Sequence, residues 1–66
     1  MKIKINGKDE EIGGRSNISE LVSGKGLVAD RIVVEHNFRI VPKEEWQKII
    51  LNESDNVEIV SFVGGG

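Results

Sequence analysis

The sequence predicts an α+β domain in which one short helix packs across a mixed sheet of four to five strands. Near its start, two segments of alternating apolar and polar residues flank an Asn-Gly pair, as in a β-hairpin. A short apolar stripe at helical spacing follows, and more strand-like segments fill the second half. A helix laid over one face of a sheet is the economical way to bury such stripes.

The opening hairpin is predicted from alternation and from the turn inside it. In residues 1–5 the odd positions are apolar and the even positions are lysine, as in a half-buried strand. Asn6-Gly7 suits a type I′ turn, which needs positive φ at both central positions. Residues 8–12 then form a more polar second strand.

The helix is predicted from its cap and from its spacing. Asn17 can cap the first turn, with Glu20 three residues later as the reciprocal partner. Three apolar residues at i, i+3 and i+4 form the buried stripe: Ile18, Leu21 and Val22. Gly24 and Gly26 end this helix, so it is short and depends on packing against the sheet.

The second half is predicted to add three strands. Residues 31–36 form one strand, Asn37-Phe38 a turn, and residues 39–41 a short strand that Pro42 ends. Pro42 then occupies the first position of a helical turn over residues 43–46. A polar turn at 52–55 precedes the last strand, 56–63, whereas Ile49, Ile50 and Leu51 receive no assignment. The first and last strands are the candidates for the centre of the sheet.

Composition favours a binding or carrier protein over an enzyme. The 66 residues suffice for one small domain, with no cysteine, no tyrosine and one histidine. We therefore expect no catalytic residues and no metal site. The net charge of −2 without a basic stripe speaks against nucleic acid, and the apolar runs are too short to span a membrane. No signal peptide is evident at the start, so we expect a cytoplasmic protein with no membrane partner.

The end of the chain is the predicted functional element. Residues 1–63 are expected to form the domain, and Gly64, Gly65 and Gly66 a flexible tail. Without side chains to bury, three glycines cannot offset the entropy of ordering, and such a tail is thin enough for a narrow channel. Extended, it carries the α-carboxylate of Gly66 about 10 Å beyond the last strand. The alternative is a frayed terminus without function.

Alternation in the last strand predicts a docking surface beside this tail. Val57 and Ile59 share one face, which we expect to be buried, whereas Glu58 shares the other with Val60 and Phe62. Val60 and Phe62 are therefore expected to be exposed apolar residues that dock a partner. The alternatives are a strand covered on both faces, or ordinary exposed apolar residues.

Three other features receive structural interpretations. His36 is interpreted as a strand histidine, because the sequence places no carboxylate or thiol beside it. Trp46 is interpreted as a packing residue, and the run from Asp9 to Glu11 as a solvated acidic face.

Several motifs resemble the ThiS family of β-grasp (ubiquitin-like) sulfur carriers of thiamin biosynthesis, and the resemblance spans nearly the whole chain. The Val-Pro-x-x-x-Trp segment combined with terminal glycines is its most specific part. The resembling segments are IKINGK (3–8), NISELV (17–22), VEHN (34–37), IVPKEEW (40–46), DNVEIV (55–60) and VGGG (63–66). Phe38 and Ser54 depart from it, since the family often has glycine at both turn positions.

The resemblance implies a protein co-substrate without catalysis of its own. A ThiF-like adenylyltransferase would activate the Gly66 carboxylate with ATP, a sulfur donor protein would convert it to a thiocarboxylate, and a ThiG-like thiazole synthase would take the sulfur. ATP and the donor are used by the partner enzymes, and no cofactor is expected on the chain itself. The alternatives are a MoaD-like carrier for molybdopterin synthesis, a ubiquitin-like tag, and a β-grasp interaction module.

Overall fold

The computed structural model describes residues 1–62. Val63, which was predicted to end the last strand, and the glycine tail lie outside the described residues. The described chain forms five strands, one α-helix and two 3₁₀ helices: β1 (Lys2–Ile5), β2 (Lys8–Glu11), α1 (Ile18–Gly24), η1 (Ala29–Arg31), β3 (Ile32–His36), β4 (Arg39–Ile40), η2 (Lys43–Lys48) and β5 (Asn56–Ser61).

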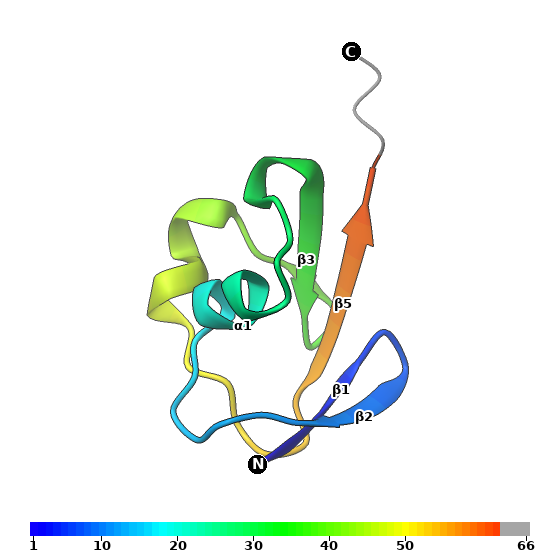
Figure 1. Ribbon diagram of the computed structural model, residues 1–66, viewed down its shortest axis with the longest axis vertical. Coiled ribbons are helices and arrows are strands. Elements are labelled where there is room, and N and C mark those ends of the chain that lie inside the picture. The colour runs from blue at the N-terminus through cyan, green and yellow to red at the C-terminus, as the bar shows by residue number, and fades with distance from the viewer. Residues whose placement is uncertain (63–66) are drawn as a thin grey trace.

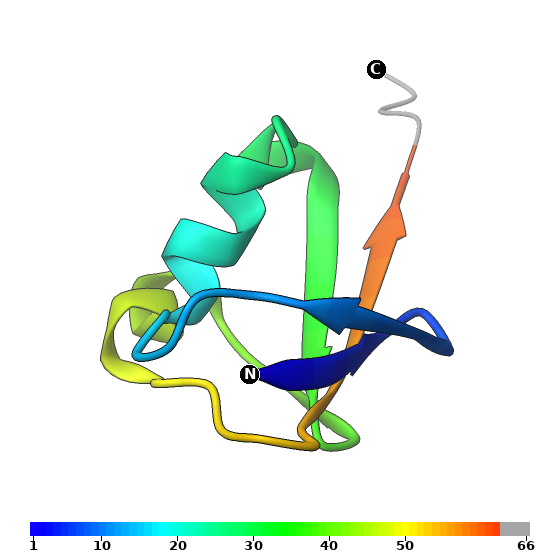
Figure 2. The same ribbon diagram turned by 60° about the horizontal axis from the view of Figure 1, so that its bottom comes forward.

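The strands form one mixed sheet in the order β2-β1-β5-β3-β4, with β5 at its centre (Figure 1). β1 runs parallel to β5 and antiparallel to β2, whereas β3 runs antiparallel to both β5 and β4. The predicted α+β class and the central positions of the first and last strands are therefore confirmed. Helix α1 lies on one face of the sheet, as the turned view shows (Figure 2).

Local sequence signals fixed the first half as predicted. Asn6 and Gly7 adopt φ values of 51° and 83°, which close the hairpin between β1 and β2. Asn17 and Glu20 form both hydrogen bonds of a capping box, at 2.7 and 2.9 Å. The predicted stripe of α1 is buried, as are the inward residues of β1, β3 and β5, and together they form one core.

The segment between β4 and β5 differs in detail from the prediction. Pro42 is the residue before η2 and not its first position, and η2 is a 3₁₀ helix that extends to Lys48. Trp46 packs in the core, and its Nε1 donates a hydrogen bond to the Val41 carbonyl at 3.0 Å. Leu51 is buried, and its backbone N–H donates to the Ser16 carbonyl at 2.8 Å, so long-range pairing holds this segment.

The two departures from the family pattern are among the non-glycine residues that adopt a left-handed backbone. Phe38 has φ 70° and Ser54 has φ 71°. A side chain there brings Cβ close to the following carbonyl oxygen, a clash that glycine lacks. Phe38 is also 80% exposed, so its ring gains little from burial. Both turns form nonetheless, because the strands and the loop around them fix their geometry.

We predict that Phe38→Gly stabilises the protein by about 0.5–1 kcal/mol. Glycine relieves the strain of the left-handed backbone, which is about 1–2 kcal/mol. This gain exceeds the stability lost because glycine makes the unfolded chain more flexible, about 0.4–1 kcal/mol. Ser54→Gly should act in the same direction. The measurement is the free energy of unfolding in denaturant. Phe38→Ala is the control, since it removes the ring but keeps Cβ, and an equal gain from it would show that strain is not the cause.

Candidate functional site

Gly64, Gly65 and Gly66 lie outside the described residues, so the structure describes the platform that leads to them. That platform is β5, which is central in the sheet and whose inward residues Val57 and Ile59 are buried, at 0% and 9% exposure. The predicted inward facing of this strand is confirmed.

The outward face of β5 carries the predicted apolar residues. Val60 is 56% exposed and Phe62 is 48% exposed, so the expectation that both are accessible is confirmed. The register adds a third member that sequence reasoning missed, because Val33 lies directly opposite Val60 on β3 and is also exposed. Val33, Val60 and Phe62 are called the apolar patch below. Alternation within residues 32–36 could have revealed Val33, but only the register puts it beside Val60.

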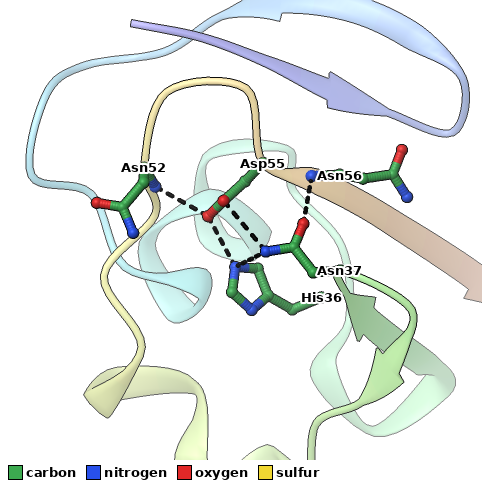
Figure 3. A network of polar contacts seen from close by, with 5 residues as sticks. All are labelled: His36, Asn37, Asn52, Asp55 and Asn56. Atoms are coloured by element: carbon green, nitrogen blue, oxygen red, sulfur yellow. Dashed lines mark hydrogen bonds and ion pairs between the residues drawn. The ribbon is translucent and has the colours of Figure 1, made fainter.

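A polar network lies at the opposite end of β5, around the buried Asp55 (Figure 3). His36 Nε2 is 2.7 Å from one Asp55 carboxylate oxygen, and Asn37 Nδ2 donates to the other at 3.2 Å. The backbone N–H of Asn52 donates to Asp55 at 2.9 Å, and that of Asn56 donates to the Asn37 side chain at 2.8 Å. The network thus connects the end of β3, the loop after η2 and the start of β5.

His36 lies in β3, as interpreted, and it also has a carboxylate partner that could not be placed from sequence. Its partner is 19 positions away, and the turn after β3 and the loop before β5 bring the two together. Because a carboxylate only accepts, Nε2 carries the proton and donates it to Asp55. The approach of Asn37 Nδ2 to this nitrogen, at 3.4 Å, is then a contact between two donors and not a hydrogen bond.

Opposing influences act on the pKa of Asp55. Burial raises the pKa, because it disfavours the charged form. The hydrogen bonds from His36, Asn52 and Asn37, together with the charge that His36 can carry, favour the carboxylate and outweigh burial. The pKa of Asp55 therefore lies below its ordinary value, and the ionised group is part of the folded structure.

The acidic run from Asp9 to Glu11 is only in part a solvated face. Asp9 and Glu11 are exposed, as predicted. Glu10 is half-buried, and both of its carboxylate oxygens lie 2.8 Å from Lys25 Nζ, beyond the end of α1. This pair holds β2 against the segment that follows the helix.

Among the described residues, the Asp55 network is not part of a metal-binding cluster. Within residues 1–62 no group of three or more His, Cys, Asp or Glu side chains could hold a metal ion. In the same part of the chain, every buried side-chain nitrogen and oxygen has a hydrogen-bond partner. None of the described helices is long and apolar enough to cross a lipid bilayer. His36, at the end of β3, lies opposite Val57, and Asp55 directly precedes β5, so both are far along the strand from Phe62.

This fold matches a solved structure along its whole length. The thiamine biosynthesis protein (ThiS) from Geobacter metallireducens superposes with a TM-score of 0.86 and 29% identity, covering 100% of both chains. The domain is thus a small β-grasp protein.

The sequence comparisons give the family. The model of the ThiS family matches residues 3–66, and the chain belongs to this family. It is 35% identical over 65 residues to the sulfur carrier protein ThiS of Bacillus subtilis (strain 168), covering 97% of this chain and 98% of that protein. The resemblance drawn from the motifs is confirmed.

Relatives of another kind are much longer than this chain. A thiazole synthase of Paramagnetospirillum magneticum is 35% identical over all 66 residues, which cover 20% of that protein. A thiazole synthase of Magnetococcus marinus is 32% identical with the same coverage. The chain therefore spans about a fifth of the length of these relatives.

We predict that Asp55→Ala lowers the free energy of unfolding by about 2–4 kcal/mol at neutral pH. The substitution leaves the His36 ring, the Asn52 N–H and the Asn37 amide without their shared acceptor, and each unpaired buried donor is costly. Denaturant unfolding measures this loss. Asp9→Ala, on an exposed carboxylate, is the matched control and should change stability by no more than about 0.5 kcal/mol.

The same variant has an expected pH dependence. Because the folded-state pKa of Asp55 is lowered, the stability that it contributes is complete above the unfolded pKa, near 3.9, and is lost as the pH falls through the folded value. The difference between native and Asp55→Ala protein should therefore shrink below about pH 4. A difference that stays constant down to pH 2 would show that the charge of Asp55 contributes nothing.

Proposed function

We propose that this protein is a sulfur carrier of thiamin biosynthesis and that the sulfur is carried on the α-carboxylate of Gly66. The observation that supports this most is the match to the ThiS family over residues 3–66. Identity to a sulfur carrier along almost the full length of both chains supports it further. The small domain then acts as a handle that enzymes recognise, with the reactive group on the tail.

The proposed chemistry explains why partner enzymes are needed. An α-carboxyl group has a pKa near 3.5, so at neutral pH it is an anion and a poor electrophile. In the first step a carboxylate oxygen attacks the α-phosphorus of ATP, and pyrophosphate leaves. In the second step hydrosulfide (HS⁻), supplied by a donor protein, attacks the acyl carbon and AMP leaves, which gives the thiocarboxylate. A thiazole synthase then takes the sulfur.

The described structure suits this role because it holds the base of the tail firmly. β5 is anchored by its buried inward residues, and the Phe62 N–H donates to the Arg31 carbonyl at 3.0 Å. The ordered chain therefore continues to within a few residues of Gly66. Gly64, Gly65 and Gly66 have no side chains, so an enzyme can close tightly around the backbone next to the reacting carbon.

We assign the docking of a ThiF-like adenylyltransferase to the apolar patch. Val33, Val60 and Phe62 are exposed on the outward face of the sheet, next to the base of the tail. Glu35 and Glu58 lie opposite each other one step further along the same strands, so charged groups border the patch on that side. An apolar centre with a polar border is typical of a protein-binding surface.

We predict that Phe62→Asp weakens binding of the adenylyltransferase at least tenfold and leaves the free energy of unfolding within about 1 kcal/mol of the native value. The side chain is half exposed and faces away from the core, so a carboxylate there disturbs docking and not the fold. Titration calorimetry and denaturant unfolding measure the two quantities. The control is Phe38→Asp, the same change in an exposed residue at the other end of β3, which should bind normally. Unfolding of the Phe62 variant would mean that the patch belongs to the core.

We predict that a peptide extension beyond Gly66 abolishes activation, because the reacting carboxylate becomes an amide within the chain. Deleting Gly66 should also abolish it, since the carboxylate then stops about 3.5 Å short of the reaction site. Gly65→Ala should have a milder effect, because it adds a methyl group without changing the reach. Intact-protein mass spectrometry after incubation with ATP, adenylyltransferase and sulfur donor follows the reaction.

The native chain should gain the mass difference of one sulfur for one oxygen. If the extended chain gains it equally well, the terminal carboxylate is not the site and the proposal fails. If the activated Gly66 carboxyl group reacts with a lysine side chain instead of with sulfide, the protein is a ubiquitin-like tag.

A further inference from the structure

The second half of β5 has a neighbouring strand on one side only. Its pairing with β3 continues to Ser61, which lies opposite Ile32. Its pairing with β1 stops at Val57, which lies opposite Ile5. Both views show β5 extending beyond the β1–β2 hairpin (Figures 1 and 2). The central strand of the sheet therefore becomes an edge strand just before the tail.

Alternation along β5 shows which peptide groups lie on this edge. The Phe62 N–H donates a hydrogen bond to the Arg31 carbonyl, on the side of β5 where β3 lies. Because successive residues of a strand direct their peptide groups to opposite sides, those of Ile59 and Ser61 point away from β3. The Ile59 N–H is occupied, because it donates to Asn6 Oδ1 at 2.7 Å. Within residues 1–62 the Ser61 N–H and the carbonyls of Ile59 and Ser61 have no hydrogen-bond partner.

A hollow of about 350 Å³ lies beside this edge, between β5, the hairpin and the segment after α1. Three of its lining residues are apolar and face the core side: Ile5, Leu27 and Ile59. Glu10 and Lys25, joined as an ion pair, lie at its border. The space next to the exposed peptide groups can therefore accept an apolar side chain from a chain laid along β5.

We propose that an extended segment of a thiazole synthase binds here as an added strand, between β5 and the β1–β2 hairpin. A row of outward peptide groups at strand spacing is matched by another extended backbone, about 4.8 Å away. Alternate side chains of that segment then point into the hollow. The unpaired peptide groups of an exposed strand edge are a ready template for pairing with another extended chain.

Two observations select a thiazole synthase as the occupant. Thiazole synthases are similar to this chain over its whole length, so in those proteins the same kind of domain and the synthase share one polypeptide. Ser61 also precedes Gly66 by five residues, about 17 Å of extended chain, so an enzyme holding the Gly66 carboxylate comes within reach of the edge. This assignment rests on the proposed function.

The test removes the Ser61 N–H without altering the side chain. A 66-residue chain can be made by chemical synthesis, with an ester in place of the peptide bond between Val60 and Ser61. Affinity for a thiazole synthase should fall about five- to tenfold, the value of one hydrogen bond. Ser61→Pro removes the same N–H in a recombinant protein and should act similarly, whereas Ser61→Ala keeps the N–H and should bind normally.

A matched ester placed before Phe62 removes the N–H that donates to the Arg31 carbonyl. It should lower the free energy of unfolding, whereas the ester before Ser61 should leave it unchanged. Amide hydrogen exchange gives a direct structural measurement. Exchange of the Ser61 amide should slow at least tenfold when the protein is saturated with the synthase.

Unchanged affinity of the Ser61 ester, or equal loss in Ser61→Ala, overturns the proposal. Loss of adenylation in the ester variant assigns the edge to the adenylyltransferase and overturns the choice of occupant. The sulfur-loading measurement separates the two proposals. If the native protein binds the synthase through this edge but never gains sulfur, only the proposed function is contradicted. If the native protein gains sulfur but the Ser61 ester variant binds the synthase with normal affinity, only the added strand is contradicted.

Discussion

The structure depends on one requirement, that β5 is fixed in the core at its start and accessible at its end. At the start, β1 and β3 pair with it on both sides, and Val57 is completely buried. At the end, one side has no strand partner within the described residues and Val60 is more than half exposed. A strand of this form can transmit the rigidity of the core to a tail while its last residues remain available for binding.

The Asp55 network strengthens the fixed end. Two separate segments, the end of β3 and the loop after η2, direct three donors to one carboxylate, so the start of β5 cannot shift without breaking several bonds together. A buried polar group of this kind costs desolvation, and its satisfied partners recover that cost only in one arrangement. The network therefore favours a single register for β5, because another register would leave these donors unpaired. Register matters here, because a slip by one residue would exchange the buried and exposed faces of the strand.

The features that could be predicted from sequence are those set by residues close together in the chain. The Asn6-Gly7 turn, the Asn17–Glu20 capping box and the alternation of β5 each involve a few neighbouring positions. The features that were missed depend on contacts across the fold. Val33 joins the apolar patch only through its register with Val60, and His36 meets a carboxylate 19 positions away. No local pattern encodes either contact.

Turn geometry explains why the deviations from the family pattern do no harm to the fold. At Phe38 and Ser54 the chain requires a left-handed backbone, for which glycine is the least strained residue. The pairing of β3 with β4 and the hydrogen bond from the Ser54 N–H to the Lys2 carbonyl, at 2.8 Å, impose that backbone on other residues. The sequence indicates which turns are strained, but only the surrounding contacts explain why the fold tolerates the strain.

Asn6 links the shape of the hairpin to the edge of β5. Its backbone adopts the positive φ that the turn needs. Its side-chain oxygen accepts a hydrogen bond from the Ile59 N–H, which a backbone carbonyl would accept if β1 were longer. Glycine would allow the turn but could not accept this bond, and a β-branched residue would resist the turn. The parallel pairing can therefore end at Val57 without leaving the next N–H unpaired. Because Asn6 satisfies that donor, the groups left for a partner begin at the Ile59 carbonyl, on the side of the strand that leads directly to the tail.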